Sequence, residues 1–434
     1  MPRTLAQCPF RLLGLTRGAG PTTEVPPVTP VAPVAPVTWH GIAVAGYEPV
    51  AEAFALTMAG RSRGGALTVR RGARTLVDVW TGWADPRRER AWTPDTPALS
   101  FSTTKGITAT AVHVLADRGT LAYDEPVATW WPEFAAAGKE RITLRDVLTH
   151  RAGLHDVRAL ARDATEILDA ELMEERLAAA RPSLGHGAPG YHAYTFGWLT
   201  GGIIRRVTGL PVAAAVRGLV ARPLELDGLD IGIPPGIDAA SPPPAEVVGS
   251  ALRLYAATER LITPVWGNLP LTRTTVRALV LPGLGALVYG PDPPIWTTQM
   301  PAVNGAFTAR GLAGMYAALA NGGAVGGRRL MRQATVRQLG KVQTRERDRV
   351  LGMEMRWRMG YHHAFMGGAP ARQAFGHYGY GGSGGWADPE SGLSFGYVTN
   401  DIGTITSPVG DRALFRLSAI VRQCADREQE PLAA

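Results

Sequence analysis

Strand-like segments lie at both ends of this 434-residue chain, and a mainly helical stretch separates them. Near the N-terminus two β-strands are predicted at Ala66–Arg70 and Thr75–Gly82, because β-branched residues flank a turn at Arg71-Gly72-Ala73-Arg74. Three more are predicted in the C-terminal third, at Gly352–Met359, Gly381–Asp388 and Leu393–Thr399. This order predicts an α+β fold with one antiparallel sheet, built from both chain ends and flanked by helices.

The helical stretch is predicted to be an insertion in that sheet domain. Residues 41–120 and 271–434 would form the α/β sheet domain, and residues 121–270 a mainly helical subdomain. Residues 1–40 stand apart as an extended, disordered arm, because Pro26–Thr38 is a Pro/Val repeat. Helices are predicted from apolar spacing at about 45–60, after Ser102 as far as Gly119, and at 144–148, 164–177, 198–207, 311–319 and 412–422.

Composition excludes several classes of protein. No apolar run reaches the roughly 18 residues that a membrane-spanning helix needs, so no integral membrane segment is expected. The only cysteines, Cys8 and Cys424, lie near opposite ends, which fits a reducing compartment and predicts a cytoplasmic protein. The net charge of +8 comes from arginines scattered among acidic residues, so no nucleic-acid partner is expected.

Lysine is rare in this chain, which has three lysines against 42 arginines. One of the three is Lys105, in Ser102-Thr103-Thr104-Lys105 at the predicted start of a helix. Residues three apart on a helix face the same way. Unlike arginine, a lysine whose pKa is lowered by burial can accept a proton. The pair therefore has the spacing that a serine nucleophile and a lysine base require, although a helix cap with a surface lysine has the same spacing.

Three further stretches carry residues that could complete a site with this pair. Tyr191-His192-Ala193-Tyr194 precedes a helix for which Thr195 is a possible N-cap, and a tyrosine in such a place is often a packing residue. The glycine-rich run from Gly376 to Gly385 leaves backbone N–H groups bare, as an oxyanion hole needs, but a turn or bulge has the same composition. The run from Leu148 to Leu154 is predicted to be structural.

Together these residues resemble the serine β-lactamase and penicillin-binding-protein superfamily, in its class C branch, and most closely the family VIII carboxylesterases. The resemblance covers roughly residues 45–425. In that family a Ser-x-x-Lys begins a helix, a Tyr-x-Asn or Tyr-x-Ser supplies a tyrosine, and Lys-Thr-Gly or His-x-Gly lines the site. Ser102 to Lys105, Tyr191-His192-Ala193 and His377-Tyr378-Gly379 match these motifs, with Tyr194 an alternative to Tyr191.

The resemblance implies a β-lactamase/transpeptidase-like fold and a function. Ser102 would be the nucleophile, Lys105 and Tyr191 the base, and the backbone N–H groups of Ser102 and Tyr380 the oxyanion hole. His377 and Gly379 would line the substrate site, His377 orienting Tyr191 or the substrate. The expected function is hydrolysis of small carboxylic esters with short to medium acyl chains, without metal or cofactor. The oligomeric state and the natural ester stay open.

Two departures from the family pattern favour esters over β-lactams. Ala193 stands where lactam-hydrolysing class C enzymes have an asparagine, and His377 stands where they have a lysine that helps to bind the substrate carboxylate. Three alternatives stay open: an acyltransferase that uses the same acyl-enzyme, a β-lactamase or D,D-peptidase, and a binding protein on the same scaffold.

Two other patterns are interpreted as coincidental. Gly381-Gly382-Ser383-Gly384-Gly385 satisfies the Gly-x-Ser-x-Gly pattern, and the glycines from Gly379 to Gly384 satisfy a dinucleotide fingerprint. Both motifs must open a helix, whereas a strand is predicted here. The adjacent His362 and His363 are predicted to point apart on a strand and to face solvent.

Overall fold

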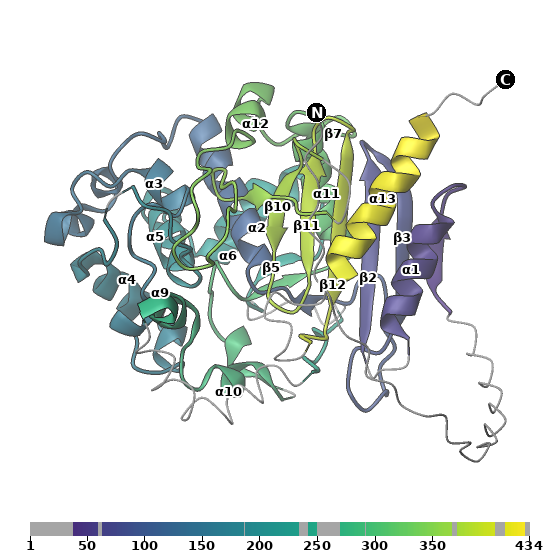
Figure 1. Ribbon diagram of the computed structural model, residues 1–434, viewed down its shortest axis with the longest axis horizontal. Coiled ribbons are helices and arrows are strands. Elements are labelled where there is room, and N and C mark those ends of the chain that lie inside the picture. The colour runs from purple at the N-terminus through teal and green to yellow at the C-terminus, as the bar shows by residue number, and fades with distance from the viewer. Residues whose placement is uncertain are drawn as a thin grey trace, which may run out of the picture. The chain divides into compact units, whose positions relative to one another are not determined.

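A seven-stranded antiparallel sheet joins the two ends of the chain (Figure 1). The computed structural model describes residues 38–59, 63–185, 187–233, 242–249, 270–290, 292–366, 371–403 and 413–429. The strands run in the order β1 (His40–Ala43), β3 (Arg74–Gly82), β2 (Gly64–Arg71), β12 (Leu393–Thr399), β11 (Gly384–Asp388), β10 (Phe375–Tyr378) and β9 (His362–His363). The N-terminal β2 pairs with the C-terminal β12 from Gly65↔Thr399 to Arg71↔Leu393, which confirms the predicted sheet.

Helices cover both faces of this sheet. On one face α1 (Glu48–Met58) lies beside α13 (Ala413–Gln429), and Val50, Phe54 and Leu417 join the core there (Figure 1). On the other face α11 (Ala309–Ala320) packs against β2, β11 and β12. The helix lies so close that a Cβ at Gly396 of β12 would sit 2.4 Å from the Ala309 carbonyl oxygen. A side chain there would displace the helix, so glycine is required.

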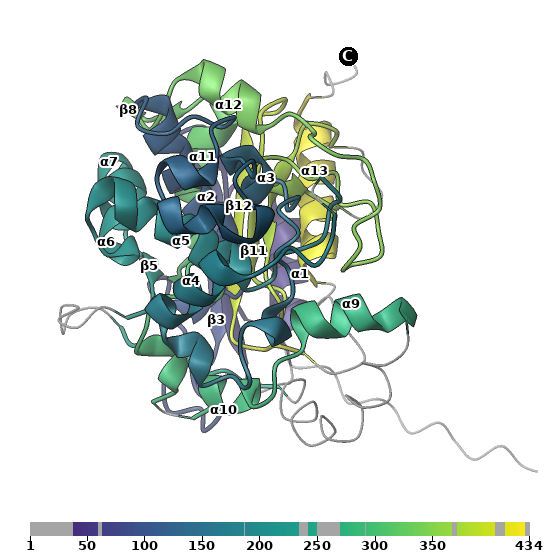
Figure 2. The same ribbon diagram turned by 90° about the vertical axis from the view of Figure 1, so that its left-hand side faces the viewer.

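The helix α2 (Thr103–Asp117) lies between the sheet and the helical part of the chain, in contact with β10 and with α5 (Thr195–Thr208). Figure 2 shows α2, α5 and α3 (Leu144–Leu148) on the side of the molecule opposite α1 and α13. Thirteen of the fifteen residues of α2 are buried, from Thr103 to Leu115. A helix buried all round belongs to the interior, so residues in its first turn are held from several sides.

The other elements complete the helical part and its connections. The helices are α4 (Ala170–Ala179), α6 (Val212–Val216), α7 (Arg222–Leu224), α9 (Pro270–Leu279), α10 (Leu284–Val288) and α12 (Gln333–Leu339). The short strands are β4 (Ala98–Leu99), β6 (Gly305–Phe307) and β5 (Leu229–Ile231) in one sheet, and β7 (Ala324–Val325) with β8 (Arg328–Arg329) in another. Single 3-10 or π turns occur at Val127–Thr129, Pro132–Gly138, Val157–Ala159, Glu166–Leu168, Arg217–Ala221 and Pro294–Trp296.

Several predicted boundaries are wrong. The segment Gly352–Met359 is not a strand, because positive φ angles at Gly352 (+71°) and Arg356 (+49°) turn the chain away from an extended path. The predicted helix at 164–177 begins only at Ala170, where the Asp169 side chain accepts a hydrogen bond from the Leu172 N–H. The predicted strand from Gly381 begins at Gly384, because Gly381 and Gly382 have positive φ.

The predicted division into domains stays a prediction. The strand β5 lies within the proposed insertion of residues 121–270, and it pairs with β6 from outside it. Residues 1–37 of the predicted arm, and Cys8 with them, lie outside the described residues. Cys424 is a free, buried cysteine on α13.

Candidate active site

Ser102 is placed by a tight turn at the start of α2. Phe101 has a φ of +41°, an uncommon value for a residue with a side chain, and Ser102 follows as the N-cap of the helix. The hydroxyl of Thr103 donates to the Ser383 carbonyl at 2.9 Å, which ties the helix start to the loop before β11. Strained backbone held in this way is common at functional sites. Ser102 itself is half-buried.

Lys105 lies one helical turn further along and is fully buried. Its Nζ lies 3.0 Å from the Ser102 Oγ, 2.6 Å from the Ala193 carbonyl oxygen and 3.0 Å from the Ala302 carbonyl oxygen. No carboxylate pairs with it among the described residues. Burial therefore lowers the pKa of Lys105 well below its usual value.

An uncharged amine, the form that a lowered pKa favours, can make all three contacts of Lys105. A neutral amine has two N–H bonds and one lone pair. The two N–H bonds can donate to the carbonyls of Ala193 and Ala302, which leaves the lone pair for the hydroxyl proton of Ser102. An ammonium group would instead donate to Ser102 and could not take its proton.

Tyr191 reaches the same serine from the segment before α5. Its hydroxyl lies 2.8 Å from the Ser102 Oγ, whereas the hydroxyl of Tyr194 donates to the Leu279 carbonyl at 3.2 Å. Burial raises the pKa of Tyr191 above its usual value, so the phenol is neutral and donates to Ser102. Of the two tyrosines that the sequence left open, Tyr191 is the one that contacts the serine.

The end of β10 forms the third side of the site. A Cβ at Gly379 would lie 2.2 Å from the Ser100 carbonyl oxygen, so only glycine lets this segment approach the start of α2. The ring of Tyr380 meets that of Phe101 edge to face at 5.8 Å. Within the described residues, the backbone N–H groups of Ser102 and Tyr380 have no hydrogen-bond acceptor, as expected of oxyanion donors.

His377 lies over Tyr191, with ring centroids 6.3 Å apart and an angle of 29° between the ring planes. Its Nδ1 is 3.1 Å from the Tyr378 carbonyl oxygen and donates to it. Its buried Nε2 has no partner in the described part of the chain. Burial lowers the pKa of His377 well below its usual value, so it is neutral and cannot replace the cationic lysine of the lactam-hydrolysing pattern.

Two further histidines were misjudged from the sequence. His362 is buried, not solvent-facing: its ring lies 4.9 Å from that of His377, and its Nε2 accepts the Tyr378 N–H at 3.1 Å. His150, in the stretch predicted to be only structural, meets the Tyr191 ring edge to face at 5.1 Å. The alternation of a strand could have identified one inward histidine of the His362–His363 pair, but nothing in the sequence pointed to His150.

Trp357 and Asp348 were not identified from the sequence. Trp357 lies in the segment Gly352–Met359 that was predicted to be a strand, and Asp348 lies just before it, outside every predicted element. The Trp357 ring stacks on the Tyr191 ring, with centroids 5.5 Å apart and planes at 10°. The Asp348 carboxylate is fully buried and accepts the Trp357 indole N–H at 2.9 Å. Tyr191 thus lies in an aromatic surround built by residues distant in sequence.

The surroundings of Ser383 are not those of a nucleophile. Its Oγ accepts the Thr399 N–H at 3.2 Å, and its carbonyl accepts the Gly379 N–H at 2.8 Å. It is buried and followed by the strand β11, not by a helix. Both coincidental glycine patterns are therefore excluded, as predicted.

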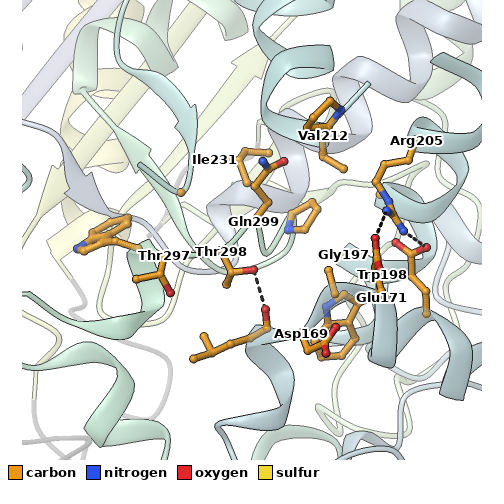
Figure 3. Close-up of a pocket in the computed structure, with 18 of the residues that line it drawn as sticks. Asp169, Glu171, Gly197, Trp198, Arg205, Val212, Ile231, Thr297, Thr298 and Gln299 are labelled. Atoms are coloured by element: carbon orange, nitrogen blue, oxygen red, sulfur yellow. Dashed lines mark hydrogen bonds and ion pairs between the residues drawn. The ribbon is translucent and has the colours of Figure 1, made fainter. Parts of the chain in front are cut away.

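A separate cavity of about 910 Å³ is lined by residues of α5, of α4 and of the segment 296–301 (Figure 3). Arg205 there pairs with Glu174 at 2.5 Å and with Glu171 at 3.6 Å. The residues that line it include no serine, cysteine, histidine or lysine. This cavity therefore lacks a serine or cysteine nucleophile with a base. No helix among the described residues is long and apolar enough to span a membrane.

Comparisons with known proteins identify the family of this chain. A model of the β-lactamase family matches residues 50–419. The esterase/β-lactamase LipL of Mycobacterium tuberculosis is 41% identical over 371 residues, which are 83% of this chain and 82% of that protein. A family VIII carboxylesterase structure (31% identity, TM-score 0.76) and a penicillin-binding protein homologue from Caulobacter crescentus (32%, 0.76) each match 89% of this chain and 100% of theirs. The chain therefore belongs to the β-lactamase family and within it resembles the family VIII carboxylesterases.

Proposed function

We propose that this serine hydrolase cleaves carboxylic esters of short to medium acyl chains through an acyl-enzyme on Ser102. The observation that carries the proposal is the fully buried Lys105 Nζ, which lies 3.0 Å from the Ser102 Oγ. Relatives named as esterases support the reaction class, because LipL and the family VIII carboxylesterase both carry that description.

In the first half of the reaction, Ser102 Oγ attacks the ester carbonyl carbon while its proton passes to the Lys105 Nζ. The backbone N–H groups of Ser102 and Tyr380 hold the negative oxygen of the tetrahedral intermediate. Tyr191 gives its phenolic proton to the departing alkoxide and regains one from the Lys105 ammonium. The alcohol leaves, and the amine and phenol are neutral again.

In the second half, water attacks the acyl carbon and gives its proton to Lys105. The Ser102 oxygen then leaves the tetrahedral intermediate, takes a proton through the same pair of side chains, and the carboxylic acid is released. His377, neutral and stacked over Tyr191, holds the phenol in place and leaves no cation for a substrate carboxylate.

The test is hydrolysis of p-nitrophenyl butyrate by Ser102→Ala and by Ser383→Ala, each checked for folding by thermal unfolding. We expect Ser102→Ala to lose activity to the background rate and Ser383→Ala to retain it. Full activity in Ser102→Ala would overturn the proposal. An intact-mass increase equal to one butyryl group in the wild type, absent in Ser102→Ala, gives a second readout.

β-Lactam hydrolysis is the second candidate, because the name of LipL includes a β-lactamase. The neutral His377 and the methyl side chain of Ala193 weaken this candidate, since His377 offers no cation for a β-lactam carboxylate and Ala193 no hydrogen-bonding group for its side-chain amide. We expect nitrocefin turnover at least about 10²-fold slower, in kcat/KM, than that of p-nitrophenyl butyrate. Comparable values for the two substrates would favour the lactamase.

A further inference from the structure

A single buried carboxylate joins three separate parts of the structure around Tyr191. The Oδ1 atom of Asp348 accepts the Tyr191 backbone N–H at 3.2 Å, and its Oδ2 atom accepts the Trp357 indole N–H at 2.9 Å. Oδ1 also accepts the N–H groups of Val350 and Leu351 at 2.8 and 2.9 Å. Asp348 is therefore bonded both to the tyrosine's backbone and to the ring stacked on its side chain.

This carboxylate lacks a cationic partner among the described residues, although its side chain is 0% exposed. Burying a charge without a counter-ion is costly, and here four N–H donors offset the cost. A turn needs only the donors of Val350 and Leu351, which an asparagine could satisfy equally well. The bonds to Tyr191 and Trp357 have no part in that local turn, and they indicate a function beyond folding it.

The bonds from Asp348 to Tyr191 and Trp357 restrict the position of the Tyr191 side chain. The Tyr191 N–H bond locates the backbone from which the phenol extends toward Ser102. The indole bond sets the plane of Trp357, which lies at 10° to the Tyr191 ring and limits its rotation on one side. A second bond, from the Arg349 N–H to the Pro189 carbonyl at 2.9 Å, holds the same two segments together.

We propose that Asp348 is a positioning residue for Tyr191: its carboxylate fixes the phenol against Ser102 by holding the Tyr191 backbone and the Trp357 indole at once. Burial raises the pKa of Tyr191 most, the hydrogen bond to Ser102 lowers it, and the negative charge of Asp348 raises it by a smaller amount. This inference rests on the proposed function of Tyr191, and its test separates the two.

The test is a double-mutant cycle of Asp348→Asn with Tyr191→Phe, read as kcat and KM for p-nitrophenyl butyrate. Asparagine keeps the shape, but its amide N–H₂ cannot accept the indole proton. We expect Asp348→Asn to lower kcat about 10- to 100-fold in the wild type, with KM changed less than about twofold. In the Tyr191→Phe background the same change should cost less than about twofold, because the group that it positions is already gone.

A purely structural role of Asp348 would also lower stability, so stability is measured beside kcat. The midpoint temperature of thermal unfolding should fall by a similar amount when Asp348→Asn is made in the wild type and in Tyr191→Phe. Asp85→Asn is the matched control: Asp85 is 2% exposed and accepts the N–H groups of Arg87, Glu89 and Arg90 in another turn. We expect Asp85→Asn to lower stability and leave kcat within about twofold of the wild type.

Trp357→Phe keeps a stacking ring and removes only the indole N–H, so it carries the test if Asp348→Asn does not fold. It should lower kcat about tenfold in the wild type and have little effect in Tyr191→Phe. An equal loss of kcat in both backgrounds would overturn the positioning role and leave the proposed function intact. Wild-type activity in Tyr191→Phe would overturn the role of Tyr191 and, with it, this inference.

Discussion

The Nζ of Lys105 and the Oγ of Ser102 lie 3.0 Å apart within the first turn of α2, and two backbone carbonyls complete the contacts of the amine. Lys139 is the instructive comparison. Its Nζ donates to three carbonyls, those of Ala136, Ala178 and Ala180, which uses every N–H of an ammonium group. Lys105 has a serine in place of the third carbonyl. The same side chain thus serves to anchor the chain at one position and can accept a proton at the other.

Lys105→Arg should lower kcat for p-nitrophenyl butyrate about 10²- to 10⁴-fold, because arginine keeps a positive charge but cannot accept the Ser102 proton. Steady-state kinetics of Lys105→Arg, and of Lys139→Arg as its control, measures the loss of kcat. Lys139→Arg, which changes a buried lysine bonded only to carbonyls, should stay within about threefold of the wild type. Equal losses in the two variants would mean that packing, not proton transfer, explains the effect.

Tyr191→Phe should lower kcat about 10²- to 10³-fold, since it removes the hydroxyl 2.8 Å from Ser102 and the proton for the leaving alcohol. Tyr194→Phe should stay within about twofold, because its hydroxyl bonds to Leu279 instead. The comparison is made on one ester at saturating concentration. The reverse ranking would assign the role to Tyr194.

Gly379→Ala should lower both kcat and stability, because its Cβ would meet the Ser100 carbonyl oxygen at 2.2 Å and push the end of β10 away from Ser102. A displacement of about 1 Å is enough to lower the rate about 10²-fold. Gly185→Ala is the control, since nothing lies within 4 Å of its Cβ position. Unchanged kinetics in Gly379→Ala would mean that this approach is not needed for catalysis.

We expect the protonation of His362 to destabilise the protein in acid. Burial, its largest cause, lowers the pKa of His362 to about 4, against about 6.5 in the unfolded chain. Between these values only the unfolded chain binds the proton, so stability rises with pH in this window and falls as pH drops from 6.5 to 4. Across this window the free energy of unfolding should fall by about 3 kcal/mol because of His362.

His362→Gln checks this assignment. Glutamine can still accept the Tyr378 N–H but does not titrate, so the midpoint of thermal unfolding should fall less steeply between pH 6.5 and 4 than in the wild type. Part of the acid effect should remain, because His113 has its pKa lowered to about 4 by burial as well. Parallel curves for the two proteins would contradict the assignment to His362.

Local patterns predicted much of the fold. The strand Leu393–Thr399 was predicted to the residue, and the hairpin of β2 and β3 to within two residues, because alternation and turn chemistry are local signals. The prediction failed at Gly352–Met359 because the backbone there turns, with positive φ at Gly352 and Arg356. Just before it, the Asp348 side chain accepts the N–H groups of Val350 and Leu351, and such local bonding competes with a strand ladder.

The candidate site divides in the same way. Ser102 and Lys105 are three residues apart, so helical geometry alone predicted that they meet. Asp348 and Tyr191 are 157 positions apart, and only the folded chain brings their atoms within 3.2 Å. His362 was misplaced for a related reason, since its partner Tyr378 lies on the neighbouring strand β10, and no local pattern shows which strands pair.

The charge of Lys105 is the central claim, and the scarcity of lysine makes it directly measurable. With ¹⁵N in lysine side chains, the protein should give three Nζ resonances, which Lys105→Arg and Lys139→Arg assign by deletion. At pH 7 we predict that the Lys105 resonance is that of a neutral amine and becomes that of an ammonium only on acidification. A Lys105 resonance that remains that of an ammonium up to pH 9, in an enzyme that is active there, would contradict the account.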